Sequence, residues 1–107
     1  MKTPREKTVD EIRDEFLAHV RSLVTYWNKL DGKDSPRTQK ERLEGLAFSI
    51  MVLLDGGTML PGFIVAPCPH ESDKEYKISQ GEDYYPYNDE KNVNGDIAGC
   101  LHELLKI

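Results

Sequence analysis

The chain has few cysteines, no long apolar run and few basic residues in its second half, and each shortage excludes a class of protein. Two cysteines among 107 residues cannot form the disulfide framework of a small secreted domain. The longest apolar run, 46–54, is interrupted at Ser49 and is far shorter than the roughly twenty residues that span a bilayer. The charged first residues do not resemble a signal peptide. We therefore expect a cytoplasmic protein without a membrane segment.

Charge is distributed unevenly along the chain. Residues 1–45 hold ten Lys/Arg and nine Asp/Glu, whereas residues 46–107 hold four Lys/Arg and ten Asp/Glu, which gives net charges of +1 and −6. An acidic segment repels phosphate backbones. Nucleic acid is therefore not an expected partner.

The length predicts one domain, because a chain of this size has the residues for a single core. Its patterns predict a helix-dominated α+β fold: an antiparallel helical hairpin, a short β element and a C-terminal helix. The expected segments are a flexible N-terminus over 1–7, helices over 8–31 and 36–55, a strand over 62–67, a short helix over 73–80, a loop over 82–95 and a helix over 97–106.

Capping residues define the predicted hairpin. Thr8 and Glu11 have capping-box spacing, which predicts that the first helix starts after Thr8, and Gly32 is its expected stop. Ser35 and Pro36 are typical of an N-cap followed by the first helical position, so a second helix should begin there. The short link between them indicates an antiparallel pair.

The second predicted helix is apolar on nearly all sides in its second half. We expect one face to pack against the first helix: Leu43, Leu46, Ala47, Ile50 and Leu54. Phe48 and Val52 then point away from the first helix, with the small residues Gly45 and Ser49 between them. A helix of this kind is covered on two sides, either by the rest of the chain or by a second subunit. These last four residues are our predicted interface.

The remaining elements rest on shorter signals. The β-branched and aromatic run 63–66 predicts the strand, which must pair with a weaker segment such as 84–87 or with its counterpart in a dimer. Ser72 and Glu75 have capping-box spacing for the short helix over 73–80, and Asp96 is the expected cap of the last helix.

Both cysteines lie in a Cys-x-His-Glu stretch, at 68–71 and at 100–103. On a helix, residues two apart lie on nearly opposite sides, so Cys100 and His102 cannot easily share a metal ion. Cys68 lies between two prolines, which favour extended backbone, so it projects to the same side as His70. Cys-x-His is not a zinc signature, so we favour coincidence and expect no metal or cofactor. The Cys68 and His70 pair stays the alternative.

A tyrosine-rich stretch is the candidate binding surface. Three tyrosines stand beside two carboxylates: Glu82, Asp83, Tyr84, Tyr85 and Tyr87. Tyrosines in a loop commonly cover the edge of a core while their hydroxyls stay in water, which is the structural interpretation. The functional interpretation is a surface for a cationic or sugar-like ligand, or for a partner protein.

A longer pattern points to a family. Residues 44–49, 54–57, 60–63 and 81–86 together resemble small uncharacterised proteins of bacteria and their phages, over roughly the last two-thirds of the chain. The resemblance implies no assigned activity and no functional residues.

We therefore expect a non-catalytic protein-interaction module that self-associates, as a homodimer or another homo-oligomer, or that binds a partner protein. The alternative is a small metal-binding protein or hydrolase that uses Cys68, His70 and nearby carboxylates. A small-ligand binder that uses the tyrosine-rich stretch is a third possibility.

Overall fold

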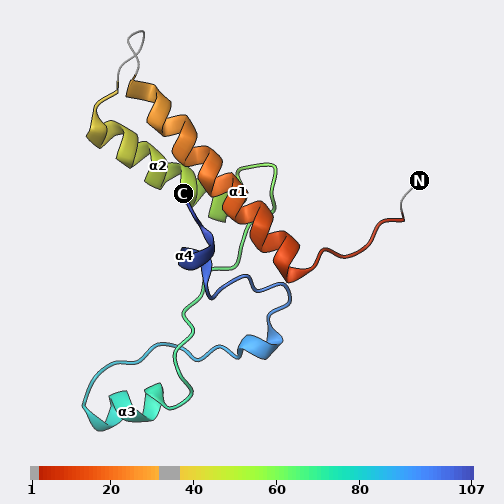
Figure 1. Ribbon diagram of the computed structural model, residues 1–107. Helices are drawn as coiled ribbons and strands as arrows, with labels where there is room; N and C mark the ends of the chain where they lie inside the picture. Colours follow the sequence, from red (N-terminus) through yellow and green to blue (C-terminus); the bar gives the residue numbers. More distant parts are fainter. Residues whose placement is uncertain (1–2, 32–36) are drawn as a thin grey trace. The chain divides into compact units, whose positions relative to one another are not determined.

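The structure, a computed structural model, describes residues 3–31 and 37–107. The chain divides into two compact units (Figure 1). The helical unit comprises the residues up to Phe63 together with Ile97–Ile107, and the loop unit comprises Ile64–Asp96. The single domain expected from the length stays a prediction. No helix in the described ranges is both long enough and apolar enough to cross a membrane.

Helix α1 spans Val9–Asn28 and continues into a 3₁₀ turn, η1, over Lys29–Asp31. The predicted capping box is confirmed: Glu11 N donates to Thr8 Oγ1 at 3.2 Å, and Thr8 N donates to the Glu11 carboxylate at 2.9 Å. Arg5 extends this arrangement with an ion pair of 2.7 Å to Glu11, which anchors the preceding segment to the helix. The expected stop at Gly32 lies outside the described residues.

Helix α2 spans Gln39–Asp55 and starts later than the sequence predicted. Its N-cap is Thr38, which forms a second capping box with Glu41. This Thr-x-x-Glu pattern is present in the sequence, whereas Ser35 and Pro36, the predicted start, lie outside the described residues. The helix ends as predicted, because Gly56 adopts a left-handed conformation with φ of 87°.

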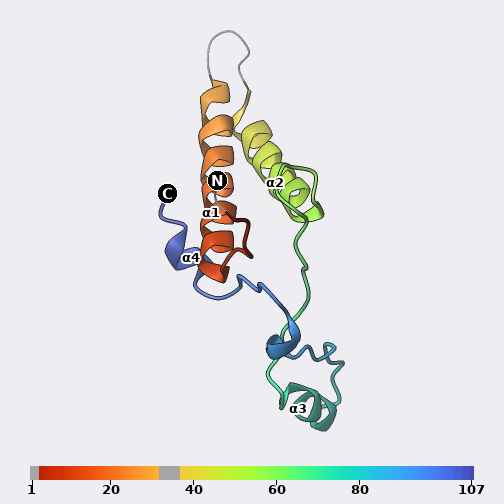
Figure 2. The same ribbon diagram turned by 90° about the vertical axis from the view of Figure 1, so that its right-hand side faces the viewer.

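The two helices pack as the expected hairpin (Figures 1 and 2). The face of α2 that meets α1 is rotated from the one predicted. Gly45 lies directly against the indole of Trp27, and Trp27 Nε1 donates to Ser49 Oγ at 3.0 Å. Leu53 is fully buried, whereas Leu43, expected to pack inward, is 59% exposed. The small residues thus accommodate the largest side chain of α1, and the apolar side chains next to them turn outward.

The predicted strand over 62–67 is wrong. The structure assigns no strand to any residue in 3–31 or 37–107, so the expected α+β class is replaced by an all-helical one. Phe63 packs edge-on against Phe16 of α1 with ring centroids 5.0 Å apart, and its N–H donates to Leu54 O. Phe63 therefore contributes to helix packing. The rest of the run, including Val65, is exposed and has no strand partner within the described ranges.

The C-terminal segment returns to α1, but its helix is shorter than predicted. Helix α4 spans only Leu101–Leu104, not 97–106. Gly99 and Cys100 both have positive φ, 92° and 43°, which interrupts a right-handed helix before α4. Ile97 is buried, and its carbonyl accepts a hydrogen bond from Arg13 Nε at 3.2 Å. Figure 2 shows α2 and α4 on different sides of α1.

The loop unit holds helix α3, Asp73–Ser79, and a 3₁₀ turn, η2, over Glu90–Asn92. The short helix lies close to its predicted position, but the capping box expected at Ser72 and Glu75 is absent. Ser72 has helical backbone angles, φ −89° and ψ −3°, whereas a capping residue is normally extended. Its hydroxyl instead lies 2.7 Å from His70 Nδ1.

Candidate functional sites

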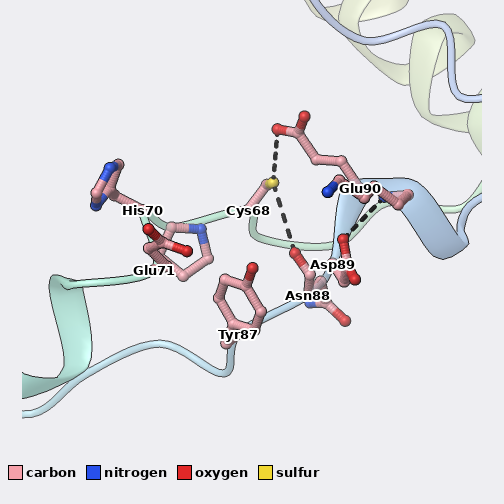
Figure 3. A pocket seen from close by; sticks show the side chains of 9 residues that line it. Cys68, His70, Glu71, Tyr87, Asn88, Asp89 and Glu90 are labelled. Atoms are coloured by element: carbon pink, nitrogen blue, oxygen red, sulfur yellow. Dashed lines mark hydrogen bonds between the residues drawn. The ribbon is translucent and has the colours of Figure 1, made fainter.

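An open hollow of about 260 Å³ lies within the loop unit (Figure 3). Two stretches of chain form it, one before α3 and one around η2. Asn88 Nδ2 donates to Pro67 O at 2.9 Å and joins the two stretches. Asp89 caps η2 by accepting from Lys91 N at 3.0 Å. The lining residues are Cys68, Pro69, His70, Glu71, Tyr87, Asn88, Asp89, Glu90 and Lys91.

Cys68 carries a thiol, the most nucleophilic kind of side-chain group in this hollow. The residues around it keep this thiol in its unreactive, protonated form. Cys68 Sγ donates a hydrogen bond of 3.1 Å to Glu90 Oε1 (Figure 3). This bond, together with the negative charges of Glu90, Asp96 and Asp89, raises the pKa of Cys68. A raised thiol pKa keeps sulfur protonated at neutral pH, and only the thiolate is a good nucleophile or metal ligand. The site therefore lacks an activated cysteine.

His70 does not join Cys68 in a common site. Its Nδ1 accepts a hydrogen bond of 3.1 Å from Ser72 N, and Figure 3 shows the imidazole turned away from the thiol. No group of three or more His, Cys, Asp or Glu side chains is arranged to hold a metal ion anywhere in residues 3–31 and 37–107. The alternative metal site at Cys68 and His70 therefore has no third ligand and no convergent geometry in the part of the chain that is described.

The predicted tyrosine-rich surface is spread over the loop unit. Tyr84, Tyr85 and Tyr87 are all exposed, and of these Tyr87 lines the hollow. The Lys74 ammonium lies 5.3 Å from the Tyr84 ring centroid, a cation–π distance, so this ring already has a cationic neighbour from its own chain. Glu82 likewise forms an ion pair of 3.4 Å with Lys77. The stretch is exposed and aromatic, but one of its rings and one of its carboxylates already contact lysines of the same chain.

The outward side of α2 presents a second candidate surface. Phe48 is 70% exposed, Leu43 59% and Met51 53%, and Ala47 is exposed between them. Residues 43, 47 and 51 are four apart, so they form one stripe along the helix, and Phe48 borders it. We call these four residues the outer face. A contiguous apolar stripe exposed on a helix is typical of an interaction site.

The predicted interface coincides with this outer face only in part. Phe48 belongs to it. Gly45 and Ser49 lie on the opposite side of α2 against Trp27, and Val52 is half-buried beside Gly57. The prediction missed Leu43 and Met51, although their spacing of four around Ala47 was visible in the sequence.

Charged residues stand at both ends of the outer face. Lys40, in the first turn of α2, forms a long, exposed ion pair of 3.8 Å with Glu44. Asp55, the last residue of α2, is exposed, and no basic residue stands in that last turn. A carboxylate at the C-terminal end of a helix is unfavourable unless a cation approaches it, because that end carries the negative pole of the helix dipole.

Comparisons of the chain with protein-family models, with curated proteins and with solved structures find no match. The resemblance to small bacterial and phage proteins therefore stays a prediction. The geometry of the two candidate sites is the basis for assigning a function.

Proposed function

We propose that this chain is a non-catalytic protein-interaction module that self-associates through the outer face of α2. The observation that carries the proposal is the exposure of Leu43, Phe48 and Met51 on one side of a well-formed helix. When a partner removes large apolar side chains gathered in this way from water, the free energy of the system falls.

The exposed fractions set the scale of the affinity. Full burial of one such side chain is worth about 1.5–3 kcal/mol. Weighted by their exposed fractions, Leu43, Phe48 and Met51 together supply about 3–5 kcal/mol per subunit, or about 6–10 kcal/mol for a symmetric pair. Association itself costs roughly 4–15 kcal/mol. At the low end of that cost the net is at best about −6 kcal/mol, so the dimer is weak, with a Kd no tighter than tens of micromolar, and dissociates on dilution.

The hollow in the loop unit gives less support to a catalytic role. Its cysteine is hydrogen-bonded to a carboxylate that raises the pKa of the thiol, and its histidine is bonded to Ser72. Neither arrangement activates a nucleophile or a general base toward a bound molecule.

The exposed thiols and the acidic charge of the loop unit bear on the cellular compartment and on the kind of partner. We place it in the cytoplasm, where glutathione and thioredoxin keep exposed thiols such as those of Cys68 and Cys100 reduced. Its partner is protein and not nucleic acid, since the loop unit carries eight Asp/Glu against three Lys.

Sedimentation velocity over a range from about 10 μM to 1 mM tests the proposal. The wild-type chain should shift from monomer to dimer across this range. Phe48→Ser should weaken the dimer, because burial of its 70% exposed ring contributes about 1–2 kcal/mol in each subunit. The dimer Kd should rise roughly 30- to 700-fold, so the shift from monomer to dimer should move to correspondingly higher concentrations.

Val65→Ser is the matched control, because Val65 is also apolar and 73% exposed but lies in the loop unit. It should leave the dimer Kd unchanged. A wild-type chain that stays monomeric at the highest concentration contradicts the proposal, as does a Phe48→Ser variant that dimerises like wild type.

A further inference from the structure

The arrangement of side chains along α2 also specifies how two copies meet. We infer that the partner of the outer face is a second copy of the same helix, packed antiparallel across a two-fold axis that passes close to Ala47. This inference rests on the proposed function, because it assigns a partner and a geometry to the surface proposed there.

Two apolar residues of the outer face, Leu43 and Met51, are distributed evenly about Ala47, and Phe48 lies directly beside it. Leu43 lies four residues before it and Met51 four residues after it, and both are more than half exposed. In an antiparallel pair centred on position 47, Leu43 of one copy therefore packs on Met51 of the other at both ends of the contact. The small side chain at the centre lets the two helix axes approach to the lower part of the usual 8–10 Å range.

The flanking charges favour the same orientation and nearly the same centre. Lys40 and Asp55 are spaced almost equally on either side of position 47. An antiparallel pair brings each Lys40 ammonium to the Asp55 carboxylate of the other copy, at the helix end where a cation is favourable. A parallel pair would instead place like charges side by side and align the two helix dipoles, both of which are unfavourable.

Disulfide trapping distinguishes the orientations. The background is the full chain with Cys68→Ser and Cys100→Ser, which removes both native thiols. In this background Ala47→Cys places one thiol at the proposed axis, where the two copies come within disulfide reach. Leu43→Cys is the control: in the antiparallel pair the two backbones at position 43 are about 12 Å apart along the helix axis, well beyond that reach.

We expect Ala47→Cys to form a covalent dimer at least about tenfold faster than Leu43→Cys when both are mildly oxidised near the dimer Kd. An equimolar mixture of Leu43→Cys and Met51→Cys should form a covalent heterodimer at a rate close to that of Ala47→Cys. The emission spectrum of Trp27, the single tryptophan, should match wild type in each variant and shows that the hairpin is intact.

Each alternative result has a distinct meaning. Fast crosslinking of Leu43→Cys alone indicates parallel helices and overturns the inference, while the proposed self-association stands. Slow crosslinking of all three samples, in a chain that still dimerises in sedimentation and is dissociated by Phe48→Ser, overturns the antiparallel register alone. A chain that never dimerises overturns the proposed function and this inference together.

Discussion

Gly45→Ala tests the packing of the hairpin. A Cβ atom added at this position would overlap the Cη2 and Cζ3 atoms of the Trp27 indole and would lie 2.7 Å from Cζ2. The ring cannot move freely, because its Nε1 is hydrogen-bonded to Ser49 and Tyr26 packs edge-on against it at 5.3 Å. The added methyl group must therefore push the two helices apart or displace the indole.

Two opposing effects decide the size of the change. Alanine in place of glycine in a helix interior stabilises the helix by about 1 kcal/mol. Overpacking a well-filled contact costs typically about 1–3 kcal/mol. Because the overlap involves a ring held at two points, we expect the packing cost to exceed the helix-propensity gain, with a net destabilisation of about 1–2 kcal/mol.

Urea unfolding followed by circular dichroism measures this change, and the fluorescence of Trp27 reports the same contact in chains that keep the indole. The matched comparison is Gly45→Ala in a Trp27→Leu background, where the overlapping ring atoms are gone. There the same substitution should stabilise the chain by about 1 kcal/mol, because only helix propensity remains. A wild-type background in which Gly45→Ala is stabilising would refute the proposed contact between Gly45 and the indole.

Two further predictions follow from shifted ionisation. Hydrogen bonds from Arg5 and Thr8 lower the pKa of Glu11 to about 2. The stabilisation that ionised Glu11 gives α1 is therefore complete above the ordinary pKa of 4.5 and is lost as the pH falls toward 2. Glu11→Gln should remove this pH-dependent stabilisation, which is measured as the urea midpoint between pH 5 and pH 2. Glu90→Gln should lower the pKa of Cys68 and speed its alkylation by iodoacetamide at pH 7.5 in a Cys100→Ser chain.

For each of these two predictions, one result would contradict it. If the urea midpoint falls equally between pH 5 and pH 2 in wild type and in Glu11→Gln, the ion pair with Arg5 does not persist in solution. An alkylation rate of Cys68 that is unchanged by Glu90→Gln would show that the thiol and the carboxylate are not in contact.

The hairpin was predictable because its signals are local. The Thr8 and Glu11 capping box and the glycine after Asp55 each act within a few residues, and both are present in the structure. The start of α2 was misplaced because the sequence holds two capping patterns within a few residues, and Thr38 with Glu41 caps the helix that begins at Gln39. Local pattern alone does not rank two adequate caps.

The errors concern properties that depend on distant residues. The run 63–66 has the residue types of a strand, but a strand needs a paired neighbour, and Phe63 instead finds Phe16 of α1. The inward side of α2 was assigned from hydrophobicity, whereas the bulk of Trp27 selects small residues opposite it. Steric fit between α1 and α2 thus decides which apolar side chains of α2 stay outside.

In the candidate sites, too, the sequence indicates local properties but not contacts between distant residues. The tyrosine-rich stretch and Phe48 are exposed, and their roles in binding and in an interface stay predictions. The hydrogen bond between Cys68 and Glu90 joins residues that are far apart in the chain, and spacing around each cysteine could not indicate it.

The return of the C-terminal segment to α1 has a consequence for how the protein is made. Arg13 and Arg21, both in the first helix, donate hydrogen bonds to the carbonyls of Ile97 and Leu105. On the ribosome, α1 is synthesised long before Ile97, and the whole of the loop unit is translated in between. The nascent helix therefore keeps these two guanidinium groups and the Ile97 side of its surface uncovered during that time, and α2, which follows it directly, is the first segment that can cover any part of it.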